Sequence, residues 1–121
     1  MWLSQNFERR EFSCRCKCGF NTVDAELLAV LTNLRTEIGK PIAILSGCRC
    51  QVWNKKVGGS VNSQHLYGKA ADIIVLDGIP ASYVATLLDS MYPHTYGIGL
   101  YNAYPNMTHI DVRPERVRWK K

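Results

Sequence analysis

Long apolar stretches are absent from the 121-residue sequence. The longest apolar runs, such as residues 73–76, are only a few residues long, whereas a membrane-spanning helix needs about 20. The first residues, 1–10, also lack the hydrophobic core of a secretory signal peptide, and their charges follow the apolar residues instead of preceding them. We therefore expect no membrane insertion, and a protein that is made in the cytoplasm with no dedicated export route.

Internal repeats and low-complexity segments are absent as well, and acidic residues are outnumbered: 10 acidic and 15 basic residues give a formal net charge of +5. The length suits one domain with a single core. Within residues 113–121, five basic residues and one acidic residue give a local +4, so the excess lies at this end. We expect a single domain over residues 1–113 and a basic tail over residues 114–121. Such a tail is most often a solvated, partly disordered end, although Trp119 could pack back on the domain.

The cysteines number five, and an odd number argues against a complete disulfide framework. Cys14, Cys16 and Cys18 are spaced two apart, and Cys48 and Cys50 repeat that spacing. The run is only a partial match to the cysteine pairs of structural zinc sites. We favour reduced, mostly buried thiols, as expected of a cytosolic product. The alternatives are a second, structural metal ion and a disulfide between Cys14 or Cys18 and Cys48 or Cys50 in an oxidising medium.

Histidine is scarce, with three in the chain, but two of them lie in a pattern typical of a metal site. His65 is followed by Asp72, and His109 lies in a later segment of alternating polarity. Asp72 precedes an apolar run, so it is expected at the start of a buried strand, where a cation would remove the cost of an unpaired charge. Two nitrogens and one oxygen suit Zn²⁺, and catalytic zinc sites usually keep a fourth position open. The alternative is that each histidine is an ordinary surface or hydrogen-bonded core residue.

Two amphipathic helices are predicted from apolar residues at helical spacing. The first has Asn21 or Thr22 as its N-cap, ends at Gly39 before Pro41, and has on one face Leu27, Leu31, Leu34 and Ile38. The second opens at Pro80 and has on one face Val84, Leu87, Leu88 and Met91.

Short strands are predicted at residues 42–45, 70–76, 96–101 and 107–112, and the last two form a hairpin. A helical turn is expected at residues 50–57 and a loop at residues 58–63. The sequence thus predicts an α+β fold, in which a small, mainly antiparallel sheet is packed by helices on one side and carries the metal site.

Several motifs together resemble a known family. They are Ser46-Gly47-Cys48-Arg49, Asn54, Val57-Gly58-Gly59, Ser63-x-His65-x-x-Gly68-x-Ala70-x-Asp72 and His109-x-Asp111. Over roughly residues 5–113, the chain resembles the zinc D-alanyl-D-alanine carboxypeptidases and their peptidoglycan endopeptidase relatives, in the compact form of phage and prophage proteins. The resemblance implies one zinc ion bound by His65, Asp72 and His109. It also implies hydrolysis of a peptide bond in the stem peptide of the cell wall.

The resemblance also implies roles around the metal. Arg49 is the candidate for binding substrate and supporting developing negative charge, since a guanidinium can hold a carboxylate through two hydrogen bonds. The alternative for Arg49 is a structural role, in which it ties the strand end to the following helix. Ser63 is carried over as a substrate-binding or supporting residue, with a simple loop cap as the alternative. Asp111 projects from the same face of a strand as His109. It is either a proton-transfer group in catalysis or, slightly preferred, a partner that orients a metal-bound histidine.

The sequence departs from the family at the general base. Relatives have a glutamate three residues before the last zinc histidine or a histidine two residues before it, and this chain has Asn106 and Met107 there. Neither can accept a proton usefully at neutral pH. Other candidates depend on the fold, namely His94, Glu11 and Glu115.

Three functions are therefore compared. The first is a zinc metallopeptidase that acts on peptidoglycan stem peptides, as a carboxypeptidase or an endopeptidase. The second is a weak or inactive zinc module that binds wall peptide or forms part of a virion, because the usual base is missing. The third, a zinc-stabilised nucleic-acid binder, ranks last because the basic excess is confined to the last residues. We expect a monomer without a specific nucleic-acid partner, acting at the wall after lysis or as a virion-associated protein.

Overall fold

The computed structural model describes residues 1–121 and has one five-stranded sheet at its centre, with the strand order β1-β2-β4-β3-β5. Every neighbouring pair is antiparallel except β3 and β5, which are parallel. The strands are β1 (Ile42–Ser46), β2 (Ala70–Val75), β3 (Gly97–Tyr101), β4 (Tyr104–Asp111) and β5 (Val117–Lys120). The predicted α+β fold with a mainly antiparallel sheet is confirmed.

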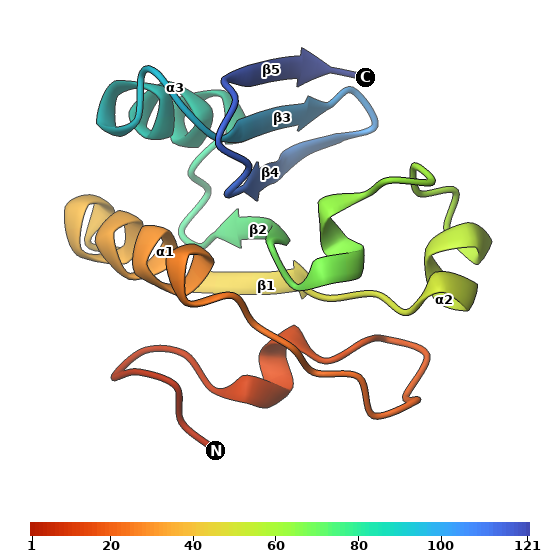
Figure 1. Ribbon diagram of the computed structural model, residues 1–121. Helices are drawn as coiled ribbons and strands as arrows, with labels where there is room; N and C mark the ends of the chain where they lie inside the picture. Colours follow the sequence, from red (N-terminus) through yellow and green to blue (C-terminus); the bar gives the residue numbers. More distant parts are fainter.

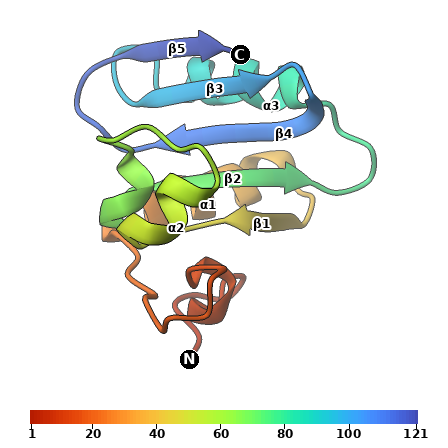
Figure 2. The same ribbon diagram turned by 90° about the vertical axis from the view of Figure 1, so that its right-hand side faces the viewer.

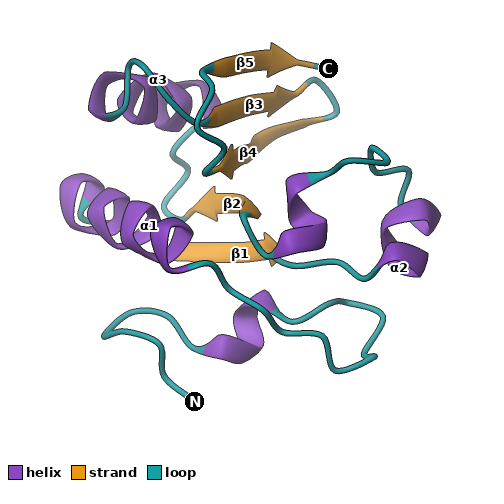
Figure 3. Ribbon diagram, in the orientation of Figure 1, coloured by secondary structure: helices purple, strands orange, loops and turns teal.

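The helices lie on both sides of this sheet (Figures 1 and 2). The two long helices, α1 (Ala25–Ile38) and α3 (Ala81–Met91), cover one face, as predicted. The short helix α2 (Gln51–Lys56) and the 3-10 helix η2 (Gln64–Tyr67) lie on the other side. The first 24 residues are loop apart from the 3-10 helix η1 (Arg9–Phe12), and they run below β1 (Figure 3). None of the helices has the length and apolar character of a membrane span.

The core lies between the sheet and the two long helices. Leu27, Leu31 and Leu34 of α1 are buried, and Ile38 packs against the cluster at its edge. From α3, Val84 and Leu88 are buried. Each large apolar side chain that is fully buried contributes about 1.5–3 kcal/mol, so the packing of the sheet against α1 and α3 stabilises the fold.

The helix boundaries differ from the prediction at one point. The N-cap of α1 is Asp24, whose carboxylate accepts hydrogen bonds from the backbone N–H groups of Glu26 and Leu27. The prediction of Asn21 or Thr22 is wrong, because an acceptor immediately before the first turn satisfies these donors directly. Gly39 ends the helix in the left-handed conformation, with φ of 68°, as predicted.

The basic end of the chain is part of the sheet. Residues 117–120 form β5, which pairs with β3 in the register Gly97↔Val117 to Leu100↔Lys120. The guanidinium of Arg118 contacts Asp89 of α3, with Nε 2.7 Å from Oδ1. The expectation of a solvated, disordered end is wrong for these residues, because backbone pairing and ion pairs outweigh the repulsion between like charges. The preceding hairpin also differs, since β4 begins at Tyr104 and its turn is shorter than predicted.

Candidate metal centre

Three side chains from separate parts of the chain meet at the end of the sheet nearest α2. Asp72 of β2 and His109 of β4 are direct partners in the antiparallel ladder, and His65 comes from η2. Their ligand atoms all lie within 4.8 Å of one another. All three residues are buried. The structure therefore brings together the three predicted metal ligands.

His65 is held with one ring nitrogen free. Its Nδ1 lies 2.6 Å from the carbonyl oxygen of Gly47, which can only accept, so Nδ1 donates and Nε2 presents a lone pair. Nε2 is buried, 3.3 Å from Oδ2 of Asp72, and has no hydrogen-bond partner. A buried polar atom without a partner is costly, and a cation shared with Asp72 would satisfy it. This orphaned nitrogen shows that the residues fit a metal ion.

His109 is oriented in the complementary way. Its Nε2 lies 2.7 Å from Oδ2 of Asp111, and its Nδ1 faces Oδ1 of Asp72 at 3.2 Å. Burial alone would lower the pKa of His109, but the hydrogen bonds to Asp111 and Asp72 raise it. Since Asp111 accepts the Nε2 proton, Nδ1 is the atom that attracts a positive charge, whether proton or metal.

The charges around Asp72 keep it ionised. Burial would raise the pKa of Asp72, but the hydrogen bond from His109 holds it well below its usual range. The pKa of His65 is lowered by burial, which keeps the imidazole neutral. A carboxylate and neutral imidazole nitrogens are the forms that bind zinc.

Asp111 lies behind His109 and is completely buried. Besides His109, its carboxylate accepts from Nε and Nη2 of Arg113, each at 2.7 Å, and from the backbone N–H of Gly97. Burial would raise the pKa of Asp111, but the hydrogen bonds from His109 and Arg113 hold it well below its usual range. With both oxygens engaged, Asp111 has the geometry of a partner that orients His109.

Arg49 and Ser63 frame the entrance to the three ligands. The guanidinium of Arg49 is mostly buried and donates to Asp72 Oδ2, Asn54 Oδ1 and Ser46 Oγ, each at 3.2 Å. The hydroxyl of Ser63 accepts from the backbone N–H of His65 and caps η2. Ser63 therefore has the loop-cap contact that was its alternative role, and it also lines the site.

The ligands open onto a cavity of about 330 Å³. Its lining includes His65 and His109 and the basic residues Arg49, Arg113 and Lys121. No aspartate or glutamate lines it, so Glu11 and Glu115 are outside, and His94 is exposed elsewhere. The three alternative bases are not brought to the site.

Two aromatic residues of the cavity were missed by the sequence analysis. The hydroxyl of Tyr101 donates to Oδ1 of Asp72 at 2.7 Å, and the ring of Trp119 packs against His109 with centroids 5.1 Å apart. Burial and the charge of Asp72 raise the pKa of Tyr101 far above its usual value, so the phenol keeps its proton. The sequence holds one signal for Tyr101, because Gly97, Gly99 and Tyr101 share one face of β3. Glycines on a strand face leave room for a bulky neighbouring group, so Tyr101 is expected to lie beside such a group.

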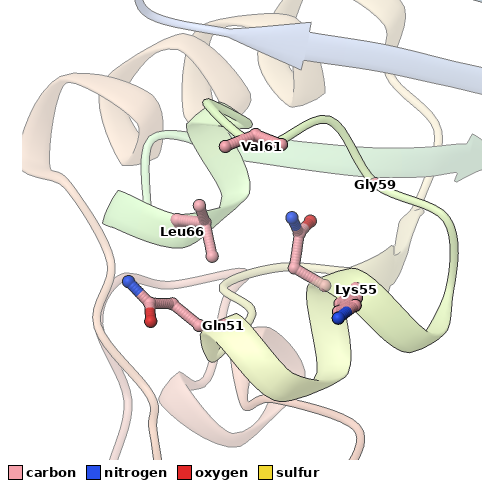
Figure 4. Close-up of a pocket in the computed structure, with 6 residues that line it drawn as sticks. Gln51, Lys55, Gly59, Val61 and Leu66 are labelled. Carbon is pink, nitrogen blue, oxygen red and sulfur yellow. The ribbon is translucent and has the colours of Figure 1, made fainter.

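A second hollow, of about 450 Å³, lies beside the cavity between α2 and η2 (Figure 4). Gln51 of α2 and Leu66 of η2 line it from opposite sides, and Val61 lies on the connecting loop. Gly59 borders both hollows. This surface holds no metal ligand.

Comparisons with known proteins agree with this geometry. No curated protein matches the chain. The family described as Peptidase M15 matches residues 5–111, which include the three ligands, Arg49 and Asp111. The match covers most of the 121 residues. The chain therefore belongs to the Peptidase M15 family of metallopeptidases, the zinc D-alanyl-D-alanine carboxypeptidase type that its motifs resemble.

Proposed function

We propose that this protein is a zinc-dependent peptidase that hydrolyses peptide bonds in peptidoglycan stem peptides. The observation that carries the proposal is the buried, unpartnered Nε2 of His65, which faces Asp72 and His109 below a cavity bordered by Arg49. One Zn²⁺ ion held by these three ligands would supply a nucleophilic water near neutral pH and polarise the scissile carbonyl.

The charge of the cavity supports an anionic peptide as the substrate. Its basic lining residues are Arg49, Arg113 and Lys121, and no acidic residue lines it. Stem peptides carry free carboxylates, and a guanidinium binds such a group through two hydrogen bonds. Arg49 is already fixed by Ser46 and Asn54, so little side-chain freedom would be lost when it holds a substrate carboxylate.

Tyr101 is the best-placed proton carrier among the residues that the cavity exposes. Its hydroxyl lies 2.7 Å from Asp72 and stays protonated at neutral pH. In this position it would hold Asp72 in place before reaction, and by turning its single proton away from Asp72 it would donate a hydrogen bond to the oxygen on which negative charge develops during hydrolysis. Asp111 would act through His109, as a positioning residue.

One observation favours a second candidate function. Apart from His65 and His109, which would bind the metal, no imidazole lines the cavity, and no acidic residue lines it as a general base. A positioned base contributes about 10²–10⁴-fold to a hydrolysis rate, so the same site without one would be a weak enzyme or a module that binds wall peptide. In either case we propose action on the wall after host lysis or from a virion, by a monomer.

The deciding experiment uses purified protein and peptidoglycan fragments with and without a chelator. New amino groups should appear with the zinc-loaded protein and should disappear with the chelator and in the His65→Ala variant. His94→Ala is the matched control, because His94 is an exposed histidine outside the site, and it should keep full activity. Zinc bound at this site without release of amino groups would instead support the binding module.

A further inference from the structure

A second group of metal-ligating side chains lies outside the site described above. The Sγ atoms of Cys14, Cys16, Cys18 and Cys50 all lie within 4.8 Å of one another. All are free thiols, and only Cys14 of the four is buried. The preference for mostly buried thiols is therefore wrong for this group, because Cys16 and Cys18 are exposed.

The distances fit one shared ion and do not fit a disulfide. The Sγ atoms are 3.4 Å apart for Cys14 and Cys16, 3.6 Å for Cys16 and Cys50, and 3.8 Å for Cys14 and Cys50. A zinc ion with four thiolates at about 2.3 Å has sulfurs about 3.8 Å apart along each edge of its tetrahedron. A disulfide needs about 2.05 Å and would join one pair only, leaving the other two thiols crowded.

The backbone around the group is arranged as it is around bound thiolates. The N–H groups of Cys50 and Trp53 donate to the sulfurs of Cys14 and Cys50, each at 3.4 Å. Such donors stabilise negatively charged sulfur. Lys17 has a left-handed φ of 66°, which is unfavourable for a residue with a side chain. This turn directs the alternate cysteines toward one point, and a bound ion would compensate its strain.

We propose that Cys14, Cys16, Cys18 and Cys50 bind a second, structural zinc ion. Cys48, the fifth cysteine, is not a ligand, since its thiol is buried and donates to the carbonyl oxygens of Phe12 and Phe20 at 3.3 Å. The site has four protein ligands and no open position, which is the character of a structural site.

The ion would fix the N-terminal segment to the wall of the metallopeptidase site. Cys50 directly follows Arg49, and the backbone N–H of Arg49 donates to the carbonyl oxygen of His65 at 2.9 Å. Residues 13–19 have no regular secondary structure of their own, so the metal would supply the order that a small core does not. The segment would thereby hold Arg49 and η2 in fixed positions relative to each other.

The test is a count of metal ions in reduced, full-length protein prepared with zinc. We expect two ions per chain in the unaltered protein and one in the His65→Ala/His109→Ala variant. One ion is also expected in the Cys16→Ser/Cys18→Ser variant, whose substituted residues are exposed. Cys48→Ser is the matched control and should keep two ions, because a hydroxyl can make the same donations as the buried thiol.

Cobalt provides a second measurement that does not depend on whether the cysteine variant folds. Co²⁺ bound to the His65→Ala/His109→Ala variant should show the thiolate-to-cobalt charge-transfer absorption of a tetrahedral sulfur site. One zinc ion in the unaltered protein, no such absorption and five freely reactive thiols would overturn the proposal. A mass lower by two hydrogens, which reports a disulfide among these cysteines, would overturn it as well. Because the two sites are removed separately, failure here leaves the proposed peptidase function untouched.

Discussion

The Nε2 atom of His109 lies 2.7 Å from Oδ2 of Asp111, two residues further along the same strand. This contact fixes the ring so that Nδ1 faces Asp72. Asp111→Asn keeps the size of the side chain but removes its charge, and zinc affinity at the histidine site should fall roughly 10–100-fold. Competition against a zinc-binding dye measures the change. Asp89→Asn, which also removes a carboxylate from arginine partners but lies far from the metal, should leave the affinity unchanged.

Arg49 is expected to act on the substrate and not on the metal. Arg49→Ala should abolish most turnover of peptidoglycan fragments while the zinc content stays the same. Arg49→Lys should be nearly as poor, because an ammonium group cannot replace the planar fork that contacts Asp72, Asn54 and Ser46. Elemental analysis alongside the assay separates the two effects. Loss of zinc in either variant would mean that Arg49 chiefly stabilises the ionised Asp72.

Gly59 is expected to set the position of Arg49. A Cβ atom at residue 59 would lie 2.0 Å from Oδ1 of Asn54 and 3.0 Å from Nη1 of Arg49. Gly59→Ala should therefore displace the Asn54 amide and loosen Arg49, raising KM for an anionic peptide several-fold at unchanged zinc content. Steady-state kinetics on a soluble fragment would measure this. An unchanged KM would show that the loop moves away as a unit and that Arg49 does not need Asn54.

The sequence could predict the metal ligands because each is part of a local pattern. The alternation around His109 marks a strand, so Asp72 and His109 meet once β2 and β4 pair. His65 lies a short turn before β2, at Gly68, and needs only that turn to join them. Trp119 could not be placed in this way. The ring of Trp119 lies over Gly99, so close that a Cβ atom at residue 99 would be 2.2 Å from it. This contact depends on the parallel pairing of β5 with β3. The cysteine group has the same dependence, since Cys50 joins the others only when residues 13–19 fold under β1.

The ion pairs of Asp89 should make β5 sensitive to acid. A hydrogen bond from Arg118 holds the pKa of Asp89 below its usual value, so the folded-state pKa is lower than the unfolded one, about 3.9. The contribution to stability is therefore present above the unfolded pKa and is lost as pH falls through the folded pKa. Thermal unfolding from pH 7 to pH 2 should show a smaller acid-induced fall in Tm for Asp89→Asn than for the unaltered protein. An equal fall in Tm for the two proteins would mean that solvent completely screens the ion pair between Asp89 and Arg118.

Tyr101 provides the sharpest test of how the site works, because its hydroxyl and its ring have different partners. The hydroxyl contacts Asp72, whereas the ring packs edge-on against Trp119 at a centroid distance of 5.2 Å. Tyr101→Phe removes only the first contact. We expect kcat to fall about 10–100-fold, with KM and zinc content nearly unchanged, because the proton that Tyr101 shares with Asp72 is no longer there to turn toward the charge that develops in the transition state.

The matched control is Tyr104→Phe, since Tyr104 is exposed and its ring also lies beside Tyr101. This variant should keep full activity. A Tyr101→Phe variant with unchanged kcat would limit Tyr101 to packing against Trp119. An equal fall of kcat and zinc affinity would instead mean that the hydroxyl works only by fixing Asp72. The split between kcat and zinc affinity thus decides whether the phenol touches the reacting atoms or only their support.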